Sequence, residues 1–414
     1  MGFSYQNQIL HAESVAITEL MATYGSPLYV YSRTDIENNW HEFDQAFGNH
    51  PHLICYAVKA NSNLAVLNVL AKCGAGFDIV SVGELERVLA AGGKANKCVF
   101  SGVAKTENEI KRALEVGVRC FNVESAAEMN RIESVAQSLG KKAPISVRVN
   151  PNVDAKTHPY ISTGLKENKF GVEMEEAIEI YQKAHNSDYL TVQGLDCHIG
   201  SQITEVSPFL DALDKVLVLL EQLNSKGIEI HHLDLGGGIG IDYQGEKTID
   251  IKSYIHSIVS KVGKIEVILE PGRAIVGNAG VFITKVEFLK QNSEHSFAIV
   301  DGAMNDLLRP SFYQAYHHVL PINENSNSGT KASWDLVGPI CETGDFLAKN
   351  RDLSLSEGDY LALMSAGAYG FTMSSNYNTR PRVAEVMVSN DTHQLVRERE
   401  TVQDLFANEH LYEI

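Results

Sequence analysis

Short hydrophobic runs alternate with helical stretches between residues 54 and 272, and this alternation constrains the fold more than any other feature of the sequence. The runs end in polar residues or glycine, and the segments between them carry apolar residues at three- and four-residue spacing. Strands that alternate with helices pair in parallel through right-handed crossovers. Eight such units over roughly 220 residues predict a closed (β/α)8 TIM barrel, for which about 250 residues are typical. The eight predicted strands are 54–60, 76–81, 98–102, 120–125, 145–150, 192–200, 230–238 and 267–272.

The rest of the chain has a different pattern. From about residue 274, β-rich segments follow one another without long helices between them. The first 26 residues are too few to fold alone, and we expect them to pack with this later region. The sequence therefore predicts an α/β protein of two domains. Residues 27–273 form the barrel, and residues 1–26 with 274–414 form a second, mainly β domain.

Charge and cysteine usage narrow the class of partner and the compartment. The formal net charge of −17 argues against nucleic acid or an anionic membrane as a partner. The six cysteines occur singly, without the CxxC spacing of a zinc or redox site, which fits a reducing compartment. The N-terminus lacks a signal-peptide pattern, and no apolar stretch approaches membrane-spanning length. We expect a cytoplasmic protein without a metal site whose ligand is a small molecule.

Two glycine-containing loops indicate a phosphate site. LDLGGGIG follows the seventh predicted strand and LEPGR follows the eighth, the two positions at which barrels of this kind often bind phosphate. Successive glycines let backbone N–H groups converge on phosphate oxygens without obstruction by Cβ atoms. The loops do not match a dinucleotide-binding unit, because no acidic ribose-binding residue and second nucleotide-binding half follow them as required.

Lys59 ends the first predicted strand, in YAVKAN. A lysine there can simply leave the core for solvent, or its amine can lie at the catalytic face, where partial burial suits it to Schiff-base chemistry. A lysine and a phosphate cradle on one rim predict pyridoxal 5′-phosphate as the cofactor. Glu270 could then face the pyridine nitrogen and His198 the ring, although the glutamate could instead pair with Arg273 and the histidine could be an ordinary core residue.

Seven motifs in order carry a resemblance to a known family. YAVKANSN, CHIGSQ, DLGGGIG, EPGR, CETGD, SAGAYG and RPRVAEV together resemble the fold-type III pyridoxal-phosphate decarboxylases, which share the architecture of alanine racemase. The resemblance covers nearly the whole chain and is strongest to the members that convert meso-2,6-diaminopimelate to L-lysine and CO2, the last step of lysine biosynthesis. Thr343 and Ala274 depart from the residues that many relatives carry, and neither is a group that the chemistry requires.

The resemblance implies roles for individual residues. Lys59, as the Schiff-base lysine, and Cys341, as the proton donor, are the implied catalytic residues, and Asp78 is a weaker transfer as a supporting residue. Cys341 and Glu342 would serve the neighbouring subunit's site in a homodimer. The implied cofactor-binding residues are Lys59, His198, Ser201, Gly237, Gly238, Glu270, Gly272, Arg273 and Tyr369. The implied substrate-binding residues are Arg273, Arg309, Tyr313, Glu342 and Tyr369.

Related activities remain as alternatives. Two arginines suit a distal carboxylate, whereas a decarboxylase that forms diamines would present an acidic pocket. An amino-acid racemase shares the barrel but commonly pairs the ring nitrogen with arginine, so Glu270 favours decarboxylation. A non-catalytic descendant would be expected to lose Lys59 or Cys341. Carboxynorspermidine decarboxylase stays the nearest alternative within the same chemistry.

Overall fold

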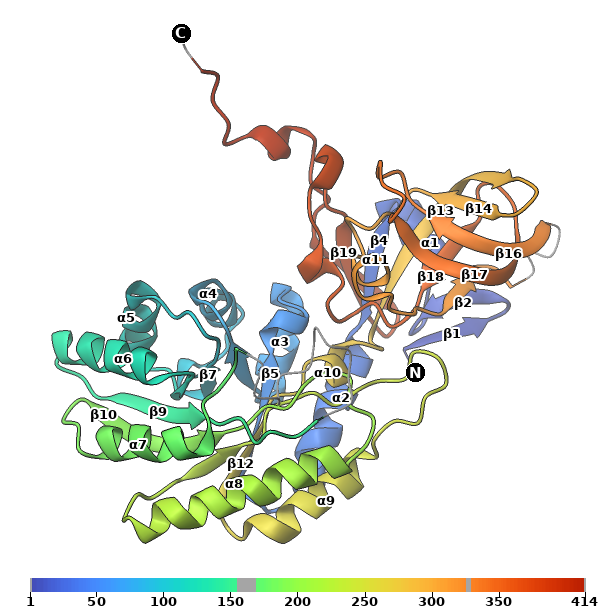
Figure 1. Cartoon of the computed structure of the whole chain (residues 1–414). Helices are drawn as coiled ribbons and strands as arrows, with labels where there is room; N and C mark the ends of the chain where they lie inside the picture. The colour runs from blue at the N-terminus through green and yellow to red at the C-terminus, as the bar shows by residue number, and fades with distance from the viewer. Residues whose placement is uncertain (1, 155–168, 325–328, 413–414) are drawn as a thin grey trace. The chain divides into compact units, whose positions relative to one another are not determined.

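The chain forms two compact units in the computed structural model, which describes residues 2–154, 169–324 and 329–412. The β unit comprises Met1–Ile36, Tyr243–Gly245 and Val276–Ile414. The barrel unit comprises Glu37–Asp242 and Glu246–Ile275 (Figure 1). No helix of the described residues is both long enough and apolar enough to cross a membrane.

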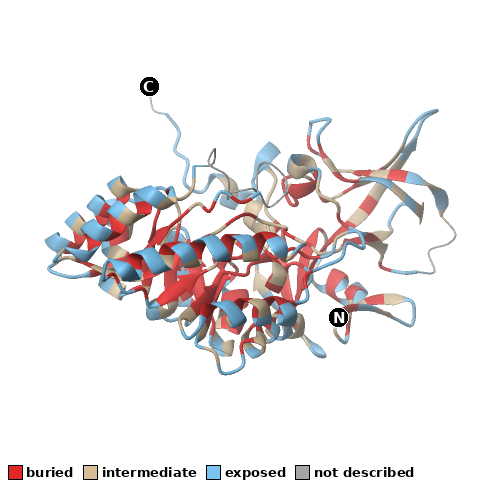
Figure 2. Ribbon diagram, turned by 60° about the horizontal axis from the view of Figure 1, so that its bottom comes forward, coloured by how far each residue is buried: buried red, intermediate tan, exposed pale blue. Residues whose placement is uncertain are grey.

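Eight parallel strands close into the predicted barrel, in the order β10-β11-β12-β5-β6-β7-β8-β9. Each predicted strand overlaps one of them, so the (β/α)8 architecture is confirmed. Their buried residues form the centre of the unit, and the surrounding helices are exposed on their outer faces (Figure 2). The strands are β5 (His52–Ala57), β6 (Gly76–Ile79), β7 (Cys98–Phe100), β8 (Cys120–Val123), β9 (Ala143–Arg148), β10 (Leu190–Asp196), β11 (His232–Asp234) and β12 (Glu266–Leu269).

Local sequence fixes where several barrel helices begin and end. Thr106 caps its helix with a capping box, because its side chain accepts from the Glu109 N–H while the Glu109 side chain accepts from Thr106. Gly117 ends the same helix in the left-handed conformation, at φ 76°. The helices are α2 (Arg33–Ala46), α3 (Leu64–Cys73), α4 (Val82–Ala90), α5 (Glu107–Val116), α6 (Ala126–Ser138), α7 (Met174–His185), α8 (Ser207–Ser225), α9 (Ile251–Val262) and α10 (Arg273–Val276).

The β unit is built on a sheet ordered β17-β16-β14-β13-β4-β19-β20, to which β15 and β18 are attached. An N-terminal three-stranded sheet and α1 pack their apolar side chains into the same core. The strands are β1 (Phe3–Gln6), β2 (Ile9–Ala12), β3 (Val15–Ala16), β4 (Leu28–Ser32), β13 (Gly280–Gln291), β14 (Ser296–Val300), β15 (Val319–Pro321), β16 (Thr330–Val337), β17 (Phe346–Leu355), β18 (Tyr360–Leu363), β19 (Ala384–Ser389) and β20 (Thr392–Arg397), with the helices α1 (Ile17–Tyr24) and α11 (Arg309–Tyr313).

The first boundary between the units lies later in the chain than residue 27, where the sequence placed it. The strand β4 pairs with β13 and β19, and its residues are buried along its whole length. It therefore belongs to the β unit, and the barrel unit begins at Glu37. The short segment Tyr243–Gly245 also belongs to the β unit, although the predicted barrel range included it.

Candidate active site

Lys59 stands where the sequence placed it, immediately after β5 at the carboxyl end of the barrel. Its Nζ lies 2.7 Å from Oδ2 of Asp78, which comes from the neighbouring strand β6 and is fully buried. The Lys59 side chain is 39% exposed. The amine is thus held by a buried carboxylate, at the end of a side chain that is partly exposed.

The glycine-rich loop after β11 brings the backbone close to the loop after β10. Gly238 has a φ of +100°, and a Cβ there would lie 2.2 Å from the Gly200 carbonyl oxygen, so only glycine fits. Arg273, directly after Gly272, donates from Nη2 to the Ser201 hydroxyl at 3.3 Å. The carboxyl ends of β10, β11 and β12 therefore bring together the predicted phosphate-binding residues of the barrel unit. These are Ser201, Gly237, Gly238, Gly272 and Arg273.

His198 is oriented by the same loop. The Gly237 N–H donates to His198 Nδ1 at 3.2 Å, which leaves the ring proton on Nε2. Burial, reinforced by the positive charges of Arg148 and Lys59, holds the pKa of His198 well below its usual range. The histidine therefore presents a neutral imidazole.

Glu270 follows β12 and is buried. Its Oε1 has no hydrogen-bond partner among the described residues. Burial raises the pKa of Glu270 well above its usual range, and the charges of Asp234, Asp78 and Asp196 add to the shift. A cation brought against this carboxylate, such as a protonated pyridine nitrogen, would offset the cost of ionising it in a buried place.

These features fit pyridoxal phosphate. The barrel end offers a lysine amine, glycine turns that admit close approach of a phosphate, and a buried carboxylate that lacks a donor. No cluster of three or more histidine, cysteine or acidic side chains suited to a metal ion occurs in the described part of the chain.

The remaining predicted residues lie in the β unit. Cys341 and Glu342 are exposed in the turn before β17. The Cys341 N–H donates to Asn378 Oδ1 at 3.0 Å, and the Tyr377 hydroxyl donates to the Glu342 carboxylate. Sequence reasoning missed Tyr377 and Asn378, although they stand a few residues before the RPRVAEV motif. Tyr369, in SAGAYG, has a positive φ of 54°.

Arg309 begins α11 and is buried. Its Nη1 lies 2.9 Å from His317 Nε2, and its guanidinium carbon lies 4.8 Å from the centre of the Tyr243 ring. Tyr313, at the end of the same helix, meets Phe312 edge-on at 4.7 Å between ring centres. The local packing thus holds the Arg309 guanidinium in a defined place.

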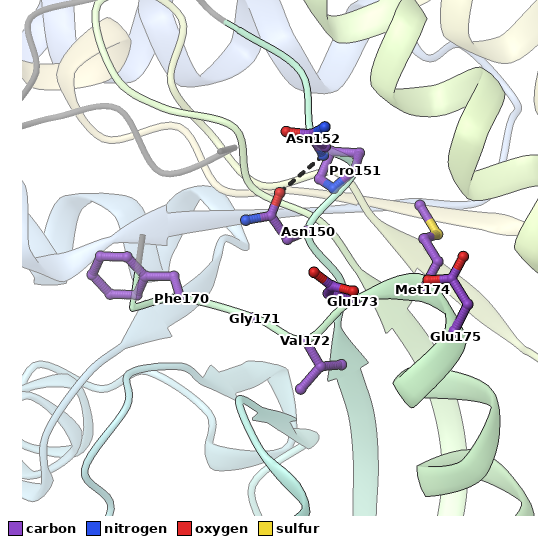
Figure 3. A pocket seen from close by; sticks show the side chains of 9 residues that line it. All are labelled: Asn150, Pro151, Asn152, Phe170, Gly171, Val172, Glu173, Met174 and Glu175. Atoms are coloured by element: carbon purple, nitrogen blue, oxygen red, sulfur yellow. Dashed lines mark hydrogen bonds between the residues drawn. The ribbon is translucent and has the colours of Figure 1, made fainter. Parts of the chain in front are cut away.

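A small pocket that the sequence did not predict lies beyond the carboxyl end of β9. It has a volume of about 200 Å³ and is lined by Asn150–Asn152 and Phe170–Glu175 (Figure 3). Beside it Arg148 pairs with Glu124 at 2.9 Å, and the Arg148 guanidinium lies 4.9 Å from the centre of the Phe170 ring. Polar residues at the ends of predicted strands, in FNVES and SVRVN, were the available signal.

Comparisons with known proteins decide the family. Residues 33–277 match the family model described as "Pyridoxal-dependent decarboxylase, pyridoxal binding domain". The chain is 57% identical to diaminopimelate decarboxylase of Vibrio cholerae, with 98% of each chain covered, and 58% identical to that of Pseudomonas aeruginosa, with 99% of each covered.

This chain belongs to the diaminopimelate decarboxylase family. Among solved structures, diaminopimelate decarboxylase from Helicobacter pylori complexed with L-lysine superimposes with a TM-score of 0.92 at 43% identity, covering 95% of this chain and 99% of that one. The predicted membership in the pyridoxal-dependent decarboxylases is confirmed, and so is the combination of a barrel with a mainly β second unit. As a member of the diaminopimelate decarboxylase family, the protein is a carboxy-lyase.

Proposed function

We propose that this protein converts meso-2,6-diaminopimelate to L-lysine and CO2 with pyridoxal 5′-phosphate as its cofactor, as the last step of lysine biosynthesis. The observation that carries the proposal is the barrel end, where an amine held by Asp78, a glycine cradle and a buried carboxylate without a donor occur together in a chain of this family.

The barrel unit supplies the residues that would hold the cofactor. Lys59 would bind the aldehyde carbon, and Glu270 would accept a hydrogen bond from the ring nitrogen. His198, kept neutral by its lowered pKa, would lie against the ring without repelling a protonated nitrogen. When bound, pyridoxal phosphate supplies an electron sink for the pair left on the α-carbon as CO2 departs. The phosphate would be bound by Ser201, Gly237, Gly238, Gly272, Arg273 and Tyr369.

The β unit supplies the proton and a ligand for the substrate amine. Cys341 would donate its Sγ proton to the α-carbon after CO2 has left, since a positioned acid is needed there. Glu342 would bind a substrate ammonium group. We propose that both act in the site of a second subunit of a homodimer. Exposure of residues 341–344 supports this, because the thiol is then accessible to a partner.

Substrate choice would depend on the distal carboxylate. Arg309, with Arg273 and Tyr313, would bind that group, because guanidinium groups make paired hydrogen bonds to carboxylates. The contacts of Arg309 with His317 and Tyr243 support this role, since a guanidinium that is already oriented loses less freedom on binding.

We further propose a cytoplasmic location, in keeping with the free cysteines.

A substrate panel tests the proposal. The purified protein with its cofactor should release CO2 and L-lysine from meso-diaminopimelate. L-lysine and ornithine should react poorly, because each lacks the distal carboxylate. If CO2 were released preferentially from carboxynorspermidine, that compound would be the substrate instead. If the amino acid were racemised without release of CO2, the protein would be a racemase and not a decarboxylase.

A further inference from the structure

The interior of the barrel holds more carboxylates than the proposed chemistry uses. Asp78, Asp196 and Asp234 come from the strands β6, β10 and β11, and Glu270 follows β12. All four are less than a tenth exposed. Carboxylates that share a buried space cannot all be ionised unless cations neutralise them.

Two cations lie near this group, and each forms an ion pair with one carboxylate. Lys59 Nζ lies 2.7 Å from Asp78, and Arg148 Nη1 lies 2.9 Å from Glu124. Burial, together with the charge of Asp234, raises the pKa of Asp196 well above its usual range. Burial and mutual repulsion therefore favour the protonated forms of Asp196 and Glu270.

Asp234 and Glu270 are neighbours at the carboxyl end of the barrel. They stand at the ends of adjacent parallel strands, which are held together beyond the ladder by the Glu270 N–H donating to the Gly236 carbonyl oxygen at 2.7 Å. Donation from a protonated Glu270 side chain to Asp234 lowers the pKa of Asp234, so the two carboxyl groups can hydrogen-bond once one of them carries a proton. Asp234 Oδ1 accepts from the Gly236 N–H at 3.0 Å, and the Asn122 side chain also hydrogen-bonds to Asp234.

One oxygen on each carboxyl group is left without a donor. Within the described residues, neither Asp234 Oδ2 nor Glu270 Oε1 has a hydrogen-bond partner when both groups are taken as acceptors. Two carboxylate oxygens form a hydrogen bond only when one of them carries a proton. Burial raises the pKa of Asp234 to about 7, which places a shared proton within the physiological range.

We propose that Asp234 is the positioning residue for Glu270: the two carboxyl groups share one proton, and Asp234 holds it whenever Glu270 is ionised against the cofactor ring. The inference rests on the proposed function, in which Glu270 faces the ring nitrogen. The proton passes from Glu270 to Asp234 along their hydrogen bond, so none enters or leaves the barrel. Protonated Asp234 then donates to Glu270, which fixes the orientation of its charge.

Two substitutions at residue 234 separate the donor from the charge. Asp234→Asn keeps the shape and an N–H donor, and so imitates the protonated acid, whereas Asp234→Leu keeps a similar volume without a donor. Cofactor-free protein is titrated with pyridoxal phosphate while its visible absorbance is followed. We expect Asp234→Asn to bind within about threefold of the native protein and Asp234→Leu to bind about ten- to a hundredfold more weakly.

Asp196→Leu is the matched control, because it removes a buried carboxyl group from the adjacent strand β10. It should keep the native affinity for pyridoxal phosphate. Equal loss in Asp196→Leu and Asp234→Leu would overturn the proposal, since the effect would then be a general one of the barrel interior. Equal loss in Asp234→Asn and Asp234→Leu would also overturn it, because the negative charge of Asp234 would be what matters.

Two further measurements keep the proposal testable if Asp234→Leu does not fold. The infrared difference spectrum between the cofactor-loaded native protein and cofactor-loaded Asp234→Asn, both at neutral pH, should show the loss of one protonated carboxyl band. A difference spectrum without such a band would refute the proposal. In a Glu270→Ala background, Asp234→Asn should leave cofactor affinity unchanged, because Asp234 acts only through Glu270. These readouts use no substrate, so a failure of the proposed decarboxylation would show separately as absent CO2 release.

Discussion

The barrel unit and the β unit hold their candidate catalytic groups in opposite ways. In the barrel unit, Glu270 is buried among other carboxylates, and burial shifts its pKa upward. In the β unit, Cys341 and Glu342 lie on an exposed turn that is held by hydrogen bonds from the segment 377–378. Burial suits groups that must tune a bound cofactor. Exposure suits groups that are offered to a site outside their own unit.

The largest expected effect comes from Lys59, on the barrel side of this comparison. Lys59→Ala should lower decarboxylation on the order of 10⁴-fold or more, because Lys59 is the amine that Asp78 holds at the barrel end in the described part of the chain. Borohydride should fix the cofactor covalently to the native protein and not to the variant. Lys59→Arg is the matched control, because it keeps the positive charge beside Asp78 but has no amine for the cofactor aldehyde. It should lose as much activity as Lys59→Ala. Covalent fixation in Lys59→Ala would disprove the assigned role.

Cys341 tests whether the exposed turn serves another subunit. Cys341→Ala should lower kcat about 10²- to 10⁴-fold, the usual contribution of a positioned acid, while cofactor binding stays native. Mixing Lys59→Ala with Cys341→Ala subunits should restore about a quarter of native activity, because half of the dimers would be mixed and each would hold one intact site. If subunits exchange and no activity returns, each chain completes its own site.

Arg309 differs from the other candidate groups of the β unit named above, Cys341 and Glu342, because it is buried. Replacing it by alanine removes a charge-assisted hydrogen bond to a desolvated carboxylate, on the order of 2–4 kcal/mol or roughly thirty- to a thousandfold in kcat/KM for meso-diaminopimelate. Cofactor occupancy should not change. Arg309→Lys keeps the charge without the paired donors. Its kcat/KM should therefore lie between the values of the native protein and of Arg309→Ala. Full efficiency in Arg309→Ala would remove the basis for naming this substrate.

Features that depend on local sequence could be predicted, whereas features that depend on contacts between distant parts of the chain could not. Strand and helix periodicity is local, so the eight barrel strands could be recognised, and Lys59 and the glycine loops follow strand ends directly. The strand β4 was missed as a member of the β unit because its partners, β13 and β19, are far away in the chain. No local pattern distinguishes a strand that joins the sheet of one unit from a strand that joins the other.

The interactions that complete the site are equally non-local. Asp234 contacts Asn122, which comes from a strand three places around the barrel, and Tyr377 reaches Glu342 from 35 positions along the chain. These pairs depend on the register of closed strands and on the path of a loop. The roles of the motif residues came from family resemblance, and the geometry here leaves them as predictions that the variants above address.

A substitution at Tyr377 tests how much its hydrogen bond to the exposed turn contributes to activity. Tyr377→Phe removes the hydroxyl that donates to Glu342 and keeps the ring. We expect kcat/KM to fall about two- to tenfold, since a single hydrogen bond at an exposed site contributes little. Cofactor affinity should match the native value. A loss as large as that of Glu342→Ala would mean that Tyr377 contacts the substrate itself.

The smallest effect concerns stability, and it contrasts the pH response of the two units. Glu400 accepts from the Arg382 side chain and backbone and from Asn376, which ties down the segment that carries Tyr377. Burial alone would raise the pKa of Glu400, but these hydrogen bonds lower it to about 2. A carboxyl group with a depressed folded-state pKa stabilises above its unfolded pKa, and the contribution is lost as pH falls towards 2.

Glu400→Gln should therefore lower the stability of the β unit at pH 7 by about 0.5–1 kcal/mol, a value reduced by solvent screening. Thermal unfolding of native and variant proteins should converge as the pH falls from about 4.5 towards 2, because the native carboxylate becomes protonated in that window. The barrel carboxylate Asp234 has the opposite sign: its raised pKa makes its ionisation cost stability as pH rises towards 7. Asp234→Asn should consequently gain relative stability as the pH rises through that range, whereas Glu400→Gln loses it between about pH 2 and 4.5. If the stability of both variants relative to the native protein changed with pH in the same direction, the buried Asp234 and the partly exposed Glu400 would not differ in the sign of their pKa shifts.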